Sequence, residues 1–125
     1  MNWSFKAFKT GSGRNIMDEW VEGLPEDDQA AIEARITLLK ATKVGIITHY
    51  FDKRKDSDKI FEIRIKGNKV QYRPLGCFGF GQGVFTLLMG ATERDRKLAP
   101  KTATKTAEIR RQLVLQNPER YLDEY

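Results

Sequence analysis

Cysteine and histidine each occur only once in the 125 residues, as Cys77 and His49. One cysteine cannot form a disulfide within the chain and cannot by itself build a zinc site, and a single histidine excludes histidine-rich metal chemistry. We therefore expect a chain that works in a reducing compartment, the cytoplasm, and that uses neither a metal nor another cofactor.

Long apolar runs are also missing. No run approaches the ~20 residues that cross a bilayer, and residues 1–6 lack the charged-then-apolar layout of a secretory signal. A membrane is therefore not among the expected partners. The hydrophobic content of 40%, with two tryptophans, is enough for one modest core, which predicts a single domain over residues 1–125.

Positive charge is concentrated in one part of the chain. Residues 53–111 contain fifteen Lys/Arg and six Asp/Glu, a net charge of +9, whereas the segments before and after each have a net charge of −2. A positive block of this length favours a polyanionic partner: RNA, DNA, an acidic protein or an anionic lipid. The alternative is a solvated surface that only keeps the protein soluble.

Apolar spacing predicts a strand and two helices in the first third of the chain. Residues 3–7 alternate between apolar and polar, as in a short strand. Residues 16–24 have the spacing of an amphipathic helix that ends near Gly23. Pro25 and the acidic residues after it predict the start of a second helix, with Gly45 as its end.

A β-hairpin is predicted for residues 60–73, which alternate on either side of a turn at 66–69. If Gly67 and Asn68 form a two-residue turn, Glu62 faces Arg73 across the hairpin. Arg64 and Arg73 then lie on the face opposite the core. In this register Arg64 has no acidic partner, whereas Arg73 has Glu62.

The second half of the chain predicts a buried strand and a last helix. The glycine-rich segment 76–83 lacks the Lys-Ser/Thr ending of a P-loop and reads as a hairpin connection. Residues 84–89 are almost all apolar, as in a central strand buried on both faces. A helix over 103–116 ends at Asn117 and Pro118. Together these elements predict an α+β fold, with an N-terminal helical hairpin packed on a small, mainly antiparallel β-sheet and a C-terminal helix.

Several short motifs resemble those of a known family. The stretch Ile60-Phe61-Glu62-Ile63-Arg64 resembles the W/Y-E-L-R strand of the RelE/ParE toxin superfamily, particularly its phage-derived, HigB-like branch. Tyr72-Arg73 is similar to the Y-R start of the next strand. Leu87-Leu88-Met89-Gly90-Ala91, Lys97 and Pro100-Lys101-Thr102 are similar to the L-L-H-G-F and K-T-P signature before the final helix. The resemblance covers residues 55–115 and agrees with the predicted order of elements.

The resemblance implies a RelE-like fold and the toxin component of a type II toxin–antitoxin system. Such a toxin has a cognate antitoxin, commonly of the helix-turn-helix type, and cleaves mRNA, usually on the ribosome, by attack of a ribose 2′-hydroxyl on the adjacent phosphate. That chemistry needs cations at the phosphate and groups that move protons. The candidate catalytic residues are Arg64, Arg73, Arg94, Glu93 and His49. The candidate RNA-binding residues are Lys53, Arg54, Lys55, Arg96, Lys97 and Lys101.

The chain departs from the family at the proton-transfer positions. Met89 stands where the L-L-H-G-F motif has histidine, and Ala91 stands where it has an aromatic residue. Tyr121 and Tyr125 read as packing or disordered residues of an acidic tail, and Arg110 as a residue of the exposed helix face. The general base is therefore not identified.

Structural alternatives exist for the cationic candidates, and a second function competes with cleavage. Arg73 serves only to pair with Glu62 in one reading, and residues 53–55 form an ordinary solvated loop in another. The alternative function is a non-nuclease binding protein on the same fold, either a gyrase inhibitor or a catalytically inert phage homologue. A DNA-binding module is disfavoured because the first two helices are rich in acidic residues.

Overall fold

The computed structural model describes residues 1–45 and 50–125. His49, one of the predicted catalytic residues, lies outside the described residues. The structure confirms an α+β fold, although it has more strands than the sequence predicts. The elements are β1 (Ser4–Phe8), α1 (Ile16–Glu22), α2 (Glu26–Lys40), β2 (Phe51–Lys53), β3 (Phe61–Ile63), β4 (Ile65–Lys66), β5 (Gln71–Tyr72), β6 (Leu75–Phe78), β7 (Val84–Met89), β8 (Thr92–Arg94), β9 (Lys97–Ala99), α3 (Ala103–Gln116), α4 (Pro118–Tyr121) and β10 (Leu122–Glu124).

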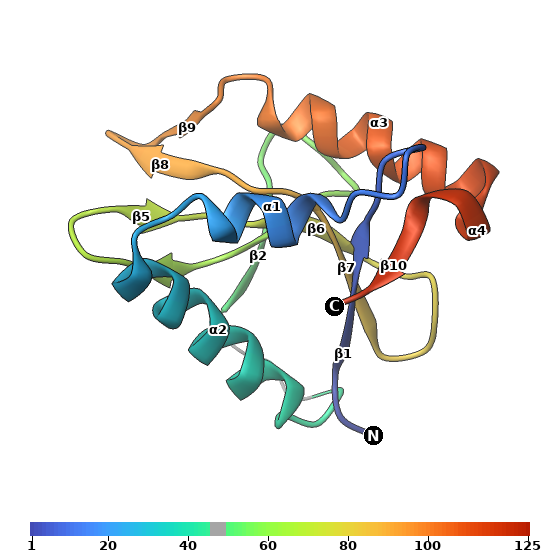
Figure 1. Ribbon diagram of the computed structural model, residues 1–125, viewed down its shortest axis with the longest axis horizontal. Coiled ribbons are helices and arrows are strands. Elements are labelled where there is room, and N and C mark those ends of the chain that lie inside the picture. The colour runs from blue at the N-terminus through green and yellow to red at the C-terminus, as the bar shows by residue number, and fades with distance from the viewer. Residues whose placement is uncertain (46–49) are drawn as a thin grey trace.

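The strands form two sheets instead of one. A six-stranded sheet has the order β10-β1-β7-β6-β3-β2, and a four-stranded sheet has the order β4-β5-β8-β9. Among the strands of the described residues, only β1 and β7 pair in parallel, so the sheets are mainly antiparallel, as predicted. In Figure 1 the strands lie between α2 on one side and α3 on the other.

The two sheets meet at breaks that the sequence pattern does not reveal. β3 passes into β4 at Arg64, β5 into β6 at Arg73 and Pro74, and β7 into β8 at Gly90 and Ala91. Proline lacks the N–H that a continuous ladder needs. At Gly90 a side chain has no room, because a Cβ atom would lie 2.1 Å from Trp20 Cδ2. The two arginines singled out from the sequence therefore sit at the junction of the sheets.

The helical hairpin forms much as predicted. Asn15 caps α1 by accepting hydrogen bonds from the amides of Met17 and Asp18, and Gly23 ends the helix. α2 starts directly after Pro25, where a missing N–H costs nothing. It ends at Lys40, earlier than the predicted stop at Gly45.

The predicted register of the β4–β5 hairpin is wrong. Ile65 pairs with Tyr72, so that four residues, 67–70, form the turn instead of two. The reason is tertiary: the buried Asp28 of α2 accepts hydrogen bonds from the Asn68 amide and from the Tyr72 hydroxyl. These two hydrogen bonds lower the pKa of Asp28, and the one from the Asn68 amide has the larger effect. The pKa of Tyr72 is raised to about 12, mainly by burial and to a smaller extent by the hydrogen bond with Asp28 and the negative charge of Asp28.

The centre of the larger sheet follows the sequence prediction. β7 is buried along five of its six residues and has β1 and β6 as neighbours. The glycine-rich segment connects β6 to β7, as expected, although its first three residues belong to β6. Gly76 is required there, since a Cβ atom would lie 2.2 Å from the Thr86 carbonyl oxygen.

The C-terminal region is more ordered than the sequence suggests. α3 has the predicted bounds, but β10 then pairs with β1 and Tyr121 stacks on Phe8 with 5.6 Å between ring centroids. The prediction that Arg110 lies on the exposed face is wrong. Its guanidinium lies 5.2 Å from the Phe8 ring centre and donates a 2.8 Å hydrogen bond to the Leu88 carbonyl, and burial lowers its pKa. Over the described residues, no helix has the length and apolar character to cross a membrane.

Candidate nucleic-acid interface

A cleft of about 460 Å³ opens at the junction of the two sheets. Four segments line it: β2 with the turn that follows, β3 with the break after it, the break after β5, and the β8–β9 hairpin. Six lining residues are cationic and three are acidic, so the cleft has a positive excess. The lining residues are Asp52, Lys53, Arg54, Lys55, Glu62, Arg64, Arg73, Glu93 and Arg96.

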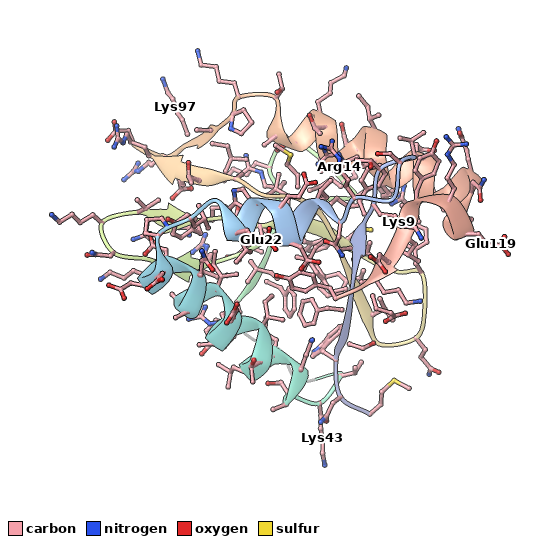
Figure 2. The ribbon with its side chains drawn as sticks, in the orientation of Figure 1. Lys9, Arg14, Glu22, Lys43, Lys97 and Glu119 are labelled. Carbon is pink, nitrogen blue, oxygen red and sulfur yellow. The ribbon has the colours of Figure 1, made fainter. Side chains whose placement is uncertain are left out.

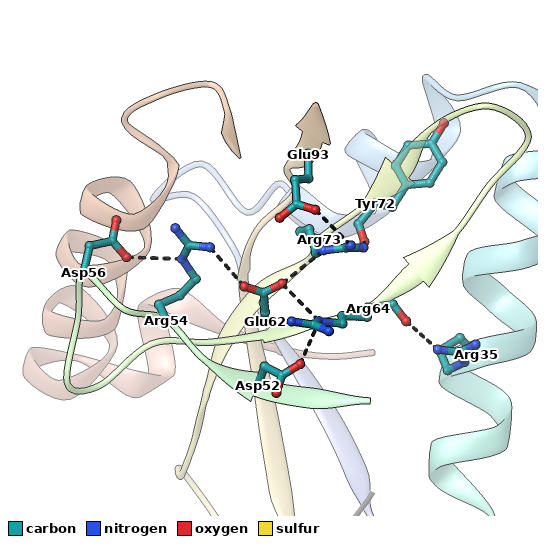
Figure 3. A network of polar contacts seen from close by, with 9 residues as sticks. All are labelled: Arg35, Asp52, Arg54, Asp56, Glu62, Arg64, Tyr72, Arg73 and Glu93. Atoms are coloured by element: carbon teal, nitrogen blue, oxygen red, sulfur yellow. Dashed lines mark hydrogen bonds and ion pairs between the residues drawn. The ribbon is translucent and has the colours of Figure 1, made fainter. Parts of the chain in front are cut away.

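Glu62 lies at the centre of this cleft, with arginines around it (Figure 3). Arg54 Nη1 donates to Glu62 Oε1 at 3.0 Å. Arg73 Nε lies 3.1 Å and Arg64 Nε 3.9 Å from Glu62 Oε2. The Glu62 side chain is only 7% exposed. Because a buried carboxylate is stable only when it is paired, Glu62 and the arginines depend on one another.

Arg73 is buried, and its two terminal nitrogens already donate hydrogen bonds within the protein. Its Nη1 donates to the Tyr72 carbonyl at 2.9 Å, and its Nη2 donates to Glu93 Oε2 at 3.2 Å. The contact of its Nε with Glu62 is an ion pair without hydrogen-bond geometry, and this N–H has no acceptor among the described residues. The predicted pairing of Arg73 with Glu62 is thus confirmed, but it runs diagonally, because Leu75 is the residue directly opposite Glu62.

Arg64 is the most open of the arginines around Glu62, with a side chain that is 57% exposed. The prediction that it lacks an acidic partner is wrong. Its Nε lies 2.7 Å from Asp52 Oδ2, because β2 pairs with β3 and brings Asp52 opposite Glu62. Its carbonyl oxygen also accepts a hydrogen bond from Arg35 of α2. Asp52 was not among the predicted site residues, since no strand was predicted over residues 51–53.

Residues 53–55 supply three of the six cations. Arg54 is held between Asp56 and Glu62 at 3.2 and 3.0 Å. Burial opposes its charge, but the hydrogen bonds with these carboxylates outweigh burial and raise its pKa. Lys53 makes only a 3.8 Å ion pair with the exposed Asp58. Lys55 makes no ion pair with any residue that the structure describes.

The charged residues of the β8–β9 hairpin do not all reach the cleft. Glu93 and Arg96 line the cleft, whereas Arg94 lines a separate groove beside β5. Glu93 borders this groove as well as the cleft. Arg96 lies in the turn between the two strands, at a positive φ of 65°. Lys97 pairs with Arg94 across the hairpin and extends outward (Figure 2). Lys101 lies in the turn before α3 and does not line the cleft.

This arrangement is suited to holding phosphate groups. Guanidinium groups stay charged and grip oxyanions through paired N–H donors, and the lysines add attraction for a polyanion. Both glutamates of the cleft, Glu62 and Glu93, are paired with arginine. The described residues contain no group of histidine, cysteine and acidic side chains suited to a metal ion.

Comparison with known proteins identifies the family. The family model described as phage-derived protein Gp49-like (DUF891) matches residues 19–112, which include every residue of the cleft lining. The chain therefore belongs to the phage-derived Gp49-like family. No curated protein and no solved structure shows significant similarity to it.

Proposed function

We propose that this chain is the toxin component of a type II toxin–antitoxin pair and that it cleaves mRNA as an endoribonuclease. The observation that carries the proposal is the cleft at the sheet junction, where four separate segments bring six cationic side chains to one concave surface. Because the positive charges are spread along the cleft, it suits a phosphate backbone better than a single small anion. The RelE-like motifs of the sequence and the membership of a phage-derived family support the same reading.

The proposed reaction is an in-line displacement at phosphorus. The ribose 2′-oxygen forms a bond to the adjacent phosphorus while the bond from phosphorus to the 5′-oxygen breaks, leaving a 2′,3′-cyclic phosphate and a 5′-hydroxyl. Arg64 and Arg96 stabilise the charge that develops on the phosphate oxygens. One group must accept the 2′-hydroxyl proton and another must protonate the leaving 5′-oxygen. Glu93, whose side chain is 29% exposed, is the proposed acceptor once the RNA phosphate has displaced it from Arg73.

The expected partners follow from this function. A toxin of this kind is paired with a cognate antitoxin, expected to be a helix-turn-helix protein, and meets mRNA in the cytoplasm, in many cases on the ribosome. A neighbouring reading frame for a small helix-turn-helix protein would support the pairing.

A matched pair of double variants tests the location of the RNA site. Arg64→Gln with Arg96→Gln removes two cations from the cleft, and Arg94→Gln with Lys97→Gln removes two cations that lie outside its lining. The assay is fluorescence anisotropy of a single-stranded RNA at several salt concentrations. Each lost phosphate contact should lower the slope of log affinity against log salt by about 0.7. We expect a loss of slope of about 1.4 for the first variant and little change for the second; equal effects would mean that only net charge matters.

A non-cleaving binding protein on the same fold is the second candidate. Two observations favour it: both glutamates of the cleft are paired with arginines, and Met89 and Ala91 replace the histidine and aromatic residue of the related motif. Induced expression with mapping of cellular mRNA 5′ ends separates the two functions. New 5′-hydroxyl ends that disappear in the cleft double variant support the nuclease. Growth arrest without such ends points to another target, such as gyrase, and no arrest points to an inert homologue.

A further inference from the structure

The three carboxylates of the cleft differ in how deeply they lie. The side chain of Glu62 is 7% exposed, whereas those of Glu93 and Asp52 are 29% and 43% exposed. Glu62 contacts the guanidinium groups from below. Glu93 instead pairs with Nη2 of Arg73, and Asp52 pairs with Nε of Arg64.

The two outer carboxylates offer the arginines the same contacts as a phosphate. Each presents a negatively charged oxygen, at 2.7 Å from Arg64 and 3.2 Å from Arg73. Arginine recognises carboxylate and phosphate with the same planar set of N–H donors. The ion pair of Arg64 with Asp52 is in contact with water and contributes little stability, so a phosphate can replace Asp52 there. Arg73 is buried and needs an anionic partner, but a phosphate that replaces the more exposed Glu93 supplies the same charge.

Glu62 cannot be replaced in this way. It is buried, and it holds Arg54 as well as Arg73. Its removal would leave two charged groups at the floor of the cleft without their shared partner. The inner carboxylate is therefore a fixed support, and the outer two are exchangeable.

We propose that Asp52 and Glu93 occupy phosphate positions of the bound RNA backbone and leave the arginines when RNA enters. The cleft of the free protein is thus partly neutralised by its own side chains, and binding consists of an exchange of carboxylate for phosphate at Arg64 and at Arg73. This inference rests on the proposed function, because it takes RNA as the ligand of the cleft. The inference identifies the arginine atoms that receive the phosphates and the two carboxylates that compete with the RNA for them.

The test compares two aspartate-to-asparagine variants that change the net charge equally. Asp52→Asn releases Arg64. Asp95→Asn is the control, since Asp95 lies in the β8–β9 turn, next to Arg96 of the cleft, and makes no ion pair with any residue that the structure describes. Asparagine also tolerates the positive φ of 52° at position 95. The probe is a single-stranded RNA with 2′-O-methyl riboses, which cannot be cleaved by 2′-hydroxyl attack.

The exchange predicts a difference between the variants in both affinity and salt dependence. Asp52→Asn should bind about threefold to fivefold more tightly than wild type, because no ion pair has to be broken. Its slope of log affinity against log salt should also steepen, because in the wild type the displaced Asp52 takes up counterions that offset part of the counterions released from the RNA. Asp95→Asn should leave the slope unchanged. Circular dichroism and thermal unfolding establish that both variants are folded.

The possible failures are distinguishable. If wild-type protein binds the RNA with a clear salt dependence but the two variants behave alike, the exchange is refuted and the proposed RNA site stands. Weaker binding by Asp52→Asn would refute the exchange as well, because Asp52 would then support the bound state. If wild-type protein does not bind RNA, the proposed function and this inference both fail.

Discussion

Replacement of Glu62 by glutamine would keep the size of the side chain and remove the charge that the surrounding arginines share. In the structure Arg54 and Arg73 contact the two oxygens of Glu62 at 3.0 and 3.1 Å. Arg73 is itself 7% exposed, so it cannot exchange its lost partner for bulk water. We therefore expect the variant to be clearly less stable than the wild type.

The magnitude follows from what each arginine retains. Removal of one partner from a buried ion pair costs about 3–5 kcal/mol. Arg73 keeps Glu93 and the Tyr72 carbonyl, and Arg54 keeps Asp56, so the lower end applies. A loss of about 3 kcal/mol is a large part of the roughly 5–15 kcal/mol that holds a small domain folded. With a urea dependence of about 2 kcal/mol per molar, the unfolding midpoint should fall by about 1.5 M.

Equilibrium urea unfolding followed by tryptophan fluorescence measures this loss, with Asp52→Asn as the control. The exposed ion pair of Asp52 with Arg64 should contribute less than about 1 kcal/mol. If Glu62→Gln lies within about 1 kcal/mol of wild type, the arginines do not depend on Glu62. The description of Glu62 as the fixed support of the cleft would then be wrong.

Three further predictions concern other parts of the fold. The pKa of Tyr72 is raised from 10.0 to about 12. Its contribution to stability is therefore complete below pH 10 and is lost as the pH rises from 10 through 12. Urea unfolding at pH 9 and pH 11 should show a larger loss of unfolding free energy for wild type than for Tyr72→Phe. Gly90→Ala should destabilise by about 1–3 kcal/mol, because its Cβ atom would lie 2.1 Å from Trp20 Cδ2; Gly23→Ala, whose nearest neighbour lies at 3.6 Å, should be close to neutral in the same thermal unfolding assay. Burial raises the pKa of the Cys77 thiol to about 11, so a thiol reagent at pH 8 should label it only after unfolding, and rapid labelling of the native protein would contradict its burial.

Local features of the sequence were sufficient to predict α1, α2, α3 and the central strand, but not the short α4. The caps of α1 and α2 act within a few residues of Asn15 and Pro25, and α3 begins and ends where the pattern predicts. β7 is recognisable because a strand that is buried on both faces is apolar at nearly every position. Six residues of the positive block line the cleft, and the polyanionic partner that the block favours stays a prediction.

The sequence predicted part of the site but not its arrangement. Arg64, Arg73, Arg96, Glu93 and residues 53–55 do line one cleft. Arg94, Lys97 and Lys101, which are close to them in the chain, do not line it. Sequence distance could not separate these groups, because the path of the β8–β9 hairpin, with its turn at Asp95 and Arg96, decides which of its side chains reach the cleft.

What the sequence determined by itself is what depends on neighbours along the chain: helix limits, strand character and the sign of the charge. The tertiary structure decided the register of β4 and β5, the division into two sheets, and the partners of the arginines. A shift of two residues keeps every side chain on its original face, so the alternation pattern fits both registers equally well. Only the buried Asp28, brought from α2 to the turn, selects one of them. In the same way, Asp52 meets Arg64 only because β2 pairs with β3 across a segment that no local pattern predicts.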